Sequence, residues 1–246
     1  MSVRKAIGAM LAIAGMALAV TGAIGLANQE RAAEAYDDLA TEVTIENDGS
    51  EEGDPGIDWA ALLATNPTIV AWCHIEGTDI DLPVCQATDD DPEHWLTHDL
   101  WDDESPAGTP YVDHRATTDS QHVLCYGHHL TGTGGMFSEL YLCHEQAEFD
   151  RILAGDLIWS TPDGRTLHLR PLCASVVDKD DADIQHFDFV NDTDFHLWLK
   201  EIPTSSSARN SSATTLVASA TRAITLVTCS SDLSGRPERT IVTFAT

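Results

Sequence analysis

A cysteine and an arginine near the C-terminus have a spacing that allows joint chemistry. Cys229 ends the apolar run AITLVTC at 223–229, and Arg239 opens the β-branched run RTIVTFAT at 239–246. If the two runs form an antiparallel pair, Cys229 and Arg239 face each other across the mouth of a hairpin. A cation there favours thiolate over thiol, and its N–H donors can hold an oxyanion or a substrate carbonyl. The pattern predicts a nucleophilic thiol.

A nucleophilic thiol also needs a proton carrier, which is most often histidine. The apolar run HVLCYGHH at 122–129 places His128 and His129 at the end of a predicted strand, as the other run places Cys229. A free cysteine at a strand end can equally be a small buried hydrophobe. The residue types and spacings alone therefore leave two interpretations open, a thiol enzyme and a structural role.

Short β-type runs separated by turn residues make up most of the chain after residue 66. Alternation along 223–229 predicts that Thr225, Val227 and Cys229 share one face of a strand. Helices are predicted at 57–67 with Asp58 as N-cap, around 136–153, and at 191–202 with Asp192 or Thr193 as cap; 204–215 is predicted to be a polar loop. The chain is therefore predicted to be a β-rich barrel with helical insertions, with strands at 68–75, 81–86, 109–114, 122–129, 156–162, 166–177, 223–229 and 239–246.

The N-terminal segment has the pattern of a membrane anchor. Arg4 and Lys5 precede an uncharged stretch at 6–27, long enough as a helix to cross a bilayer. We expect a cytoplasmic tip and signal-anchor helix at 1–28, a juxtamembrane helix and acidic linker at 29–56, and one catalytic domain at 57–246. A cleaved signal peptide is the alternative for the first segment.

Charge and cysteine usage exclude some function classes. The 246 residues include 40 acidic and 13 basic side chains, giving a net charge of −27, which repels phosphate backbones and predicts no nucleic-acid partner. Six cysteines without a CxxC pair argue against a zinc-ribbon or thioredoxin-type site. Disulfides are possible in an exported protein, but the spacing assigns none. The acidic runs at 88–93 and 178–183 lack EF-hand spacing, so no metal site is predicted.

Several motifs together resemble those of sortases, the cell-envelope transpeptidases of Gram-positive bacteria. TLVTC at 225–229 is followed ten residues later by Arg239, and YGH at 126–128 follows a predicted strand upstream. The order of the motifs is kept from about residue 57 to residue 246. Three longer segments resemble class B sortases in particular: NPTIVAWCHIEGTDIDLPVCQ at 66–86, WLTHDLWDDESPAGTPYVDHR at 95–115 and GTGGMFSELYLC at 132–143.

The resemblance implies a fold and a set of site residues. The implied fold is a closed, roughly eight-stranded β-barrel with N-terminal helices and a helix before the penultimate strand. Cys229 is implied as nucleophile, His128 as general acid/base and Arg239 as the group that stabilises the oxyanion and positions substrate. Val227 stands where class B members often have Ser, and Ser230 where Asp is frequent, which leaves the substrate motif open. The residues expected to flank the site are His129, Thr228, Val227, Ser230 and Tyr126.

The resemblance also implies a reaction, partners and a location. The reaction is cleavage of a C-terminal sorting signal through a thioacyl-enzyme, followed by transfer of the acyl group to an amine. The expected partners are sorting-signal peptides of secreted surface proteins, an amine of a peptidoglycan precursor or a pilin, and the lipid bilayer through residues 6–27, with no cofactor. The expected location is the bacterial cell membrane, with one pass, a cytoplasmic N-terminus and an extracellular catalytic domain. A thiol peptidase without transfer and a non-enzymatic, disulfide-stapled surface domain remain as alternatives.

Overall fold

The strands close into a barrel. The computed structural model describes residues 25–45, 56–232 and 235–246. In this part of the chain eight strands pair in the order β11-β10-β6-β5-β4-β3-β7-β8, a pairing of β11 with β8 closes the ring, and β9 extends β8. The strands are β3 (Ile69–Ile75), β4 (Asp81–Gln86), β5 (Tyr111–Val112), β6 (His122–Tyr126), β7 (Leu157–Ser160), β8 (Thr166–Asp178), β9 (Ala208–Arg209), β10 (Ala223–Cys229) and β11 (Glu238–Ala245). A separate pair is formed by β1 (Thr44–Ile45) and β2 (Gly56–Ile57).

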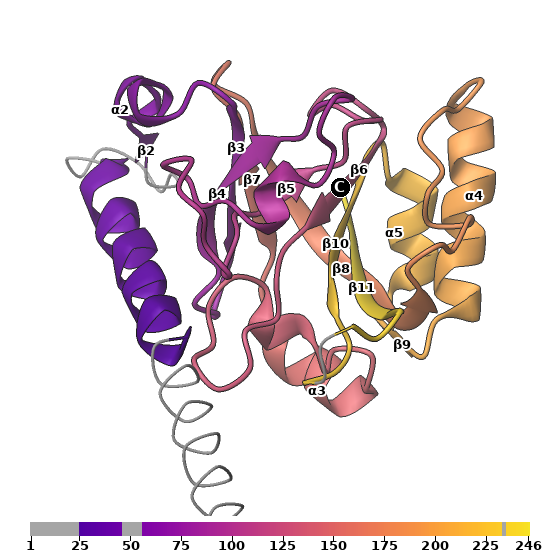
Figure 1. The fold of residues 1–246 in the computed structure, drawn as a ribbon. Coiled ribbons are helices and arrows are strands. Elements are labelled where there is room, and N and C mark those ends of the chain that lie inside the picture. The colour runs from indigo at the N-terminus through magenta and orange to yellow at the C-terminus, as the bar shows by residue number, and fades with distance from the viewer. Residues whose placement is uncertain (1–24, 46–55, 233–234) are drawn as a thin grey trace, which may run out of the picture.

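Helices flank the barrel on two sides (Figure 1). An N-terminal helix, described over 25–43, lies on one side, and α4 and α5 lie on the other. Buried apolar side chains of α4 and α5, among them Phe195, Leu199 and Leu216, form one cluster with residues of β8. The labelled helices are α2 (Trp59–Thr65), α3 (Gln146–Ile152), α4 (Asp192–Ser205) and α5 (Ala213–Ser219), with short 3₁₀ turns η1 (His94–Leu96) and η2 (Ser138–Leu140).

The predicted fold class is confirmed. Each of the eight predicted β-runs overlaps one barrel strand, the barrel is closed, and helices precede the penultimate strand β10. Asp58 caps α2, as predicted, by accepting a hydrogen bond from the Ala61 amide at 3.0 Å. The cap of α4 is Asn191 instead of Asp192 or Thr193, and its side chain accepts from the amides of Thr193 and Asp194.

Two local predictions were wrong. The segment 204–215, predicted as a polar loop, contains β9 and the first residues of α5. Its serines and threonines conceal a helical spacing in which Ala213, Leu216 and Val217 are buried on one face. The single helix predicted around 136–153 is instead η2 and α3, separated by a turn at 141–145.

Both faces of β10 are covered, which fixes the direction of its side chains. Ile224 and Leu226 point into the main core of the barrel. Val227 points to the opposite face, where it packs with Leu124, Ile184 and Ile241 in a smaller apolar cluster. The predicted alternation is therefore confirmed, and Cys229 projects from the same strand face as Val227.

The N-terminal helix packs against the barrel through residues three and four positions apart. Tyr36, Leu39 and Val43 are buried. The Tyr36 hydroxyl lies 2.8 Å from Oγ1 of Thr109 and accepts a hydrogen bond from the Leu100 amide at 3.0 Å. The helix expected to be juxtamembrane thus contributes to the core. The domain boundaries at 28 and 56 stay a prediction, since 1–24 and 46–55 lie outside the described residues.

The expected localisation needs correction. Among the residues that the structure describes, no helix is both long and apolar enough to cross a bilayer. Most of the expected span at 6–27 lies outside the described residues, and 25–27 begin the helix that buries Tyr36 and Leu39 against the barrel. The expectation of a single-pass membrane protein with an extracellular catalytic domain is therefore not upheld, nor is the lipid bilayer as a partner.

Candidate active site

Cys229 and Arg239 face each other at one edge of the barrel. In the antiparallel pair β10–β11, Cys229 is the register partner of Arg239, directly after the pair formed by Thr228 and Thr240. The predicted hairpin geometry is therefore confirmed. Cys229 is partly exposed at the end of its strand, and Arg239 is partly exposed at the beginning of the next.

His128 reaches the same edge through a parallel strand pair. Strands β6 and β10 run parallel, with Tyr126 beside Val227, and the Gly127 amide donates to the Val227 carbonyl at 3.0 Å. Parallel strands end at the same edge of a sheet. His128 and Cys229 each stand two residues beyond Tyr126 and Val227, the last residues paired between β6 and β10, so the two backbones carry them to the same edge of the barrel.

The ring of His128 is held from the loop before β5. Its Nε2 lies 2.8 Å from the Leu96 carbonyl oxygen, so this nitrogen carries the proton and donates. In the neutral ring, Nδ1 is then the atom that can accept a proton. Gly108, at φ +60°, packs against the ring: a Cβ there would lie 2.5 Å from the Trp95 oxygen and 3.1 Å from Cδ2 of His128.

The glycine of YGH is needed for contact and not for an unusual dihedral angle. A Cβ on Gly127 would lie 2.5 to 2.9 Å from three ring carbons of Phe137. The Phe137 amide in turn donates to the His128 carbonyl at 3.0 Å. The segments 126–128 and 136–137, both of which carry motifs of the resemblance, therefore pack directly on each other.

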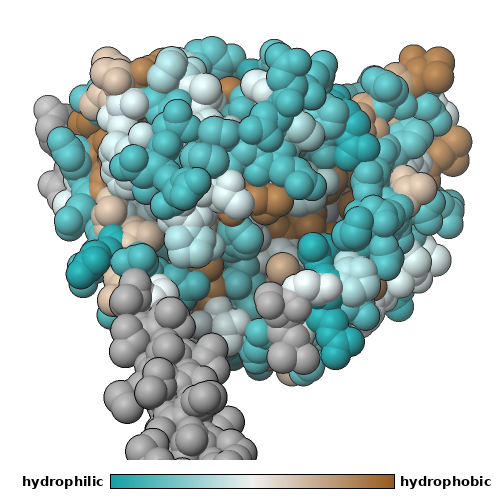
Figure 2. Space-filling view, in the orientation of Figure 1, coloured by the Kyte–Doolittle hydropathy of each residue, from teal (hydrophilic) through white to brown (hydrophobic). Residues whose placement is uncertain are grey.

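The guanidinium of Arg239 is tethered to its own loop but retains free donors. Its Nη1 donates to the carbonyls of Arg236 at 2.7 Å and Glu238 at 3.0 Å. No acceptor among the described residues is paired with its Nε or Nη2. Arg239 also borders a groove of about 390 Å³ whose lining includes Tyr126, Val227 and Ile241. Figure 2 shows a hydrophobic hollow in a mainly hydrophilic face, in front of the strands that Figure 1 labels β10 and β11.

Tyr126 belongs to a hydrogen-bonded group beside the groove. Its hydroxyl donates to Asp113 at 3.0 Å, and Arg115 pairs with the same carboxylate at 2.7 Å. Burial alone would raise the pKa of Asp113, but the hydrogen bonds from Arg115 outweigh it and hold that pKa below its usual value. Burial and the neighbouring carboxylate raise the pKa of Tyr126, so its hydroxyl stays protonated and acts as a donor.

Three of the expected flanking residues have buried side chains. Val227 is buried, and Thr228 is buried with a hydroxyl that has no partner in the described part of the chain. The side chain of His129 is only 6% exposed, stacks on Tyr141 at 4.3 Å between ring centres, and lies 3.0 Å from Asp232 through Nε2. Ser230 is partly exposed.

Cys229 differs from the other five cysteines in its exposure. All six thiols are free, and the five others are buried. Burial raises the pKa of each buried thiol, to about 12 for Cys85, Cys143 and Cys173 and further for Cys73 and Cys125. A buried neutral thiol is a poor nucleophile. Chemistry by a cysteine in this fold therefore falls to Cys229.

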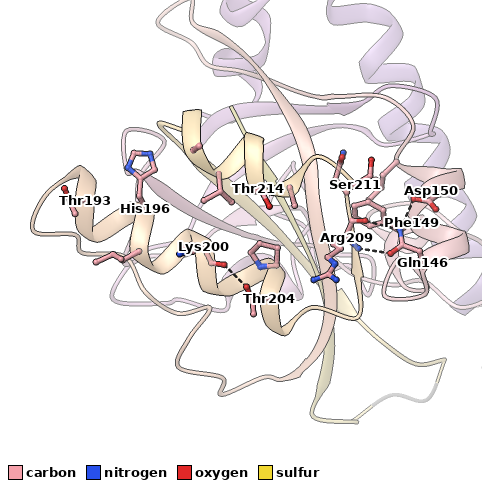
Figure 3. A pocket seen from close by; sticks show the side chains of 17 residues that line it. Gln146, Phe149, Asp150, Thr193, His196, Lys200, Thr204, Arg209, Ser211 and Thr214 are labelled. Atoms are coloured by element: carbon pink, nitrogen blue, oxygen red, sulfur yellow. Dashed lines mark hydrogen bonds between the residues drawn. The ribbon is translucent and has the colours of Figure 1, made fainter.

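A larger cavity lies elsewhere in the fold. It has a volume of about 1230 Å³ and lies between α3, α4, α5 and the residues after β9. Figure 3 shows its lining, which includes Lys200 and Arg209 but none of Cys229, His128 and Arg239. We place the candidate site at the barrel edge because the strand pairing carries Cys229, His128 and Arg239 to that edge. In the described ranges, no group of three or more His, Cys, Asp or Glu side chains is arranged to hold a metal ion.

Three contributors to the site were not predicted from the sequence. The Leu96 carbonyl holds His128, Gly108 packs against its ring, and Asp232 contacts His129. Gly108 lies within a segment that was singled out, so its glycine was a usable signal. A main-chain carbonyl carries no sequence signal, and the pairing of Asp232 depends on two loops that are far apart along the chain.

Two of three comparisons with known proteins find similarity to sortase B proteins. No protein-family model matches the chain. It is 32% identical to Sortase B of Listeria monocytogenes over 81 residues, and this match spans about a third (32%) of the length of that relative.

Solved structures resemble the chain over a larger part of its length. A Staphylococcus aureus sortase B–substrate complex matches with a TM-score of 0.62 and 24% identity, covering 76% of this chain and 83% of that one. Sortase B from B. anthracis matches with a TM-score of 0.71 and 20% identity, covering 89% and 97%. A mutant form of Clostridium perfringens sortase B matches with a TM-score of 0.65 and 23% identity, covering 76% and 84%. The chain therefore resembles class B sortases in sequence and has the fold of their solved structures.

Proposed function

We propose that the chain is a sortase-type cysteine transpeptidase. One observation supports the proposal most: Cys229, His128 and Arg239 leave three adjacent strands at one edge of the barrel, with Cys229 and Arg239 in register. The proposed roles are nucleophile for Cys229, general acid/base for His128 and oxyanion stabilisation for Arg239. The similarity to Sortase B over 81 residues supports the same reaction class.

The proposed reaction has two acyl-transfer steps. The Cys229 thiolate attacks a peptide carbonyl, and a carbon–sulfur bond forms while negative charge develops on the oxygen. Arg239 stabilises that charge through N–H groups not used by its own loop. The carbon–nitrogen bond then breaks as His128 gives a proton to the leaving amine. An incoming amine loses a proton to His128 and displaces the thiolate, which restores the enzyme.

The proposed substrates follow from the relatives. One related structure is a sortase B–substrate complex and another is a sortase B complex with triglycine. We propose that this chain cleaves a sorting-signal peptide of a surface protein and transfers the acyl group to an amine of a peptidoglycan precursor or a pilin. Val227 lines the groove, at a position where class B sortases often have Ser. We therefore propose that the sorting motif of this chain differs from the motifs that those proteins cleave.

A peptide-library cleavage assay tests this proposal. The wild type is incubated with the library alone and with added triglycine, and products are identified by mass spectrometry. We expect Cys229→Ala to abolish cleavage and Cys143→Ala, which removes a buried thiol, to retain it. Triglycine should divert the product from the free acid to an amide.

The products of this assay separate the alternatives. Free acid alone, at every triglycine concentration, would indicate a thiol peptidase without transfer. Cleavage by the Cys229→Ala variant at the wild-type rate would overturn the proposal.

A further inference from the structure

Two loops leave the candidate site and meet again beyond it. One follows β6 and contains His128 and His129, and the other follows β10 and contains Asp232. His129 Nε2 lies 3.0 Å from Oδ1 of Asp232, and the Thr131 hydroxyl donates to the Asp232 carbonyl at 3.4 Å. The loop after the cysteine is therefore fastened to the loop after the histidine.

This contact and the last hydrogen bond of the sheet enclose the reacting pair. The last bond between β6 and β10 joins the Gly127 amide to the Val227 carbonyl at 3.0 Å. His128 follows Gly127 and precedes His129, while Cys229 lies between Val227 and Asp232. Each of the two chain segments is thus fixed to the other on both sides of its reactive residue.

The environment of His129 fixes the position of its ring. Its side chain is 6% exposed and is stacked on Tyr141 with an angle of 17° between the rings. The Tyr141 carbonyl accepts from the Thr240 hydroxyl at 2.7 Å, which links the stacked pair to β11 next to Arg239. The ring cannot swing away without losing this packing, so Asp232 meets a fixed donor. The side chain of Asp232 is 60% exposed, so the contact joins a fixed, buried donor to a carboxylate at the surface.

The geometry points to His129 and Asp232 as a positioning pair that sets the distance between the Cys229 thiol and the His128 imidazole. The inference rests on the proposed function, because it assigns Cys229 and His128 as the reacting groups. Neither member of the pair contacts substrate in this role. His129 acts through the chain that it shares with His128, and Asp232 acts through the chain that it shares with Cys229.

Two pairs of variants separate the hydrogen bond from packing. His129→Phe keeps a ring on Tyr141 but loses the donor, whereas His129→Gln keeps an N–H donor near the position of Nε2. Asp232→Ala removes the acceptor. The matched control is Asp119→Ala, at the opposite end of β6. Asp119 also connects two loops, because its Oδ1 accepts a hydrogen bond from Nη2 of Arg165 at 2.6 Å. The double variant His129→Phe/Asp232→Ala tests whether the two residues act together.

Two measurements are made on each full-length variant. The first is kcat and KM for a peptide that the wild type cleaves, and the second is the rate at which iodoacetamide alkylates Cys229 at pH 7.5, followed by mass spectrometry. We expect His129→Phe and Asp232→Ala to lower kcat by roughly 10- to 100-fold, the loss typical of misplaced reacting groups, with KM within about twofold. His129→Gln and Asp119→Ala should retain wild-type kcat. The kcat of the double variant should be no lower than that of either single variant. Alkylation of Cys229 should slow in the variants with low kcat.

The outcomes are decisive in each direction. Wild-type kcat and alkylation rate in both Asp232→Ala and His129→Phe would overturn the inference. So would a loss of kcat in His129→Gln with wild-type kcat in His129→Phe, since that would show that ring packing and not the hydrogen bond matters. If the wild type cleaves no peptide but Asp232→Ala still slows alkylation and Asp119→Ala does not, the proposed function fails while the positioning role stands.

Discussion

Two threonines on β10 differ in what their hydroxyls meet. Thr225 lies 3.0 Å from Nε2 of His122 and 3.0 Å from the hydroxyl of Thr243. The hydroxyl of Thr228 is buried and has no partner in the described part of the chain. Leaving a buried hydroxyl unpaired costs about 1–3 kcal/mol, whereas a paired one contributes about 1 kcal/mol. The same residue type therefore has opposite effects three positions apart.

Replacing each threonine by valine should reveal this difference. Thr228→Val removes the unpaired hydroxyl and should raise the free energy of unfolding by about 1 kcal/mol. Thr225→Val removes the partner of His122 Nε2 and of the Thr243 hydroxyl and should lower the free energy of unfolding by about 1–3 kcal/mol. Urea unfolding of the two variants measures both effects. Changes of the same sign in both variants would contradict the assignment of the two hydroxyls.

Gly108 affects the candidate site through the ring of His128. An alanine there is strained by the positive φ and would press on the Trp95 carbonyl and on Cδ2 of His128. Gly77 has a similar φ, +82°, but nothing lies within 4 Å of a Cβ built on it. We expect Gly77→Ala to lower the free energy of unfolding by about 1 kcal/mol, and Gly108→Ala to lower it by more.

Peptide cleavage then isolates the contact with the histidine. Gly108→Ala should lower kcat by at least about tenfold, because the imidazole is displaced from the thiol. Gly77→Ala, as the control, should leave kcat unchanged. Equal kcat values for the two variants would mean that the position of His128 does not depend on Gly108.

At the scale of elements, a buried histidine joins two strands to the segment before α4. His122, at the start of β6, has its Nδ1 2.9 Å from the His186 carbonyl and its Nε2 3.0 Å from Thr225 on β10. Its ring also lies 4.5 Å from that of Trp198 on α4. Burial lowers the pKa of His122 to about 4, so the ring is neutral in the folded protein at neutral pH.

This depressed pKa predicts a loss of stability in mild acid. An unfolded histidine titrates near pH 6.5, so between about pH 6.5 and pH 4 the unfolded chain binds a proton that the folded chain does not. The free energy of unfolding should therefore fall by about 3 kcal/mol as the pH drops through this window, from the shift of the His122 pKa alone. His122→Asn, which keeps a donor for His186, should be less stable at pH 8 but lack this part of the decline. Parallel stability curves for wild type and variant from pH 8 to pH 4 would rule out His122 as the cause.

The elements predictable from the sequence are those defined by local pattern. Alternation and turn residues located all eight barrel strands, and the spacing of Cys229 and Arg239 indicated a hairpin whose register the structure confirms. Helix α5 was missed because its apolar positions are separated by threonines that favour a loop. The hydrogen bond between Tyr36 and Leu100 and the hydrogen bond between His128 and the Leu96 carbonyl were also not predicted. Both depend on partners more than 30 residues away, and no local pattern encodes such contacts.

At the scale of the whole molecule, the net charge of −27 opposes the compact state. Several basic side chains in the described ranges are already paired with carboxylates, as Arg115 is with Asp113 and Arg165 with Asp163. These pairs leave a large excess of carboxylates on the surface. Folding brings those charges closer together than they are in the expanded chain, so their mutual repulsion destabilises the folded state.

This repulsion predicts that salt stabilises the protein. The screening length falls from about 30 Å at 0.01 M to about 10 Å at 0.1 M, a range that spans the separations between surface charges on one domain. The midpoint of thermal unfolding should therefore rise as sodium chloride increases from 0.01 to 0.1 M. Sodium thiocyanate should give the same rise over this range, because screening depends on ionic strength and not on the anion. A midpoint that stays constant or falls in both salts would show that attractive pairs, such as Arg165 with Asp163, outweigh the repulsion among the excess carboxylates.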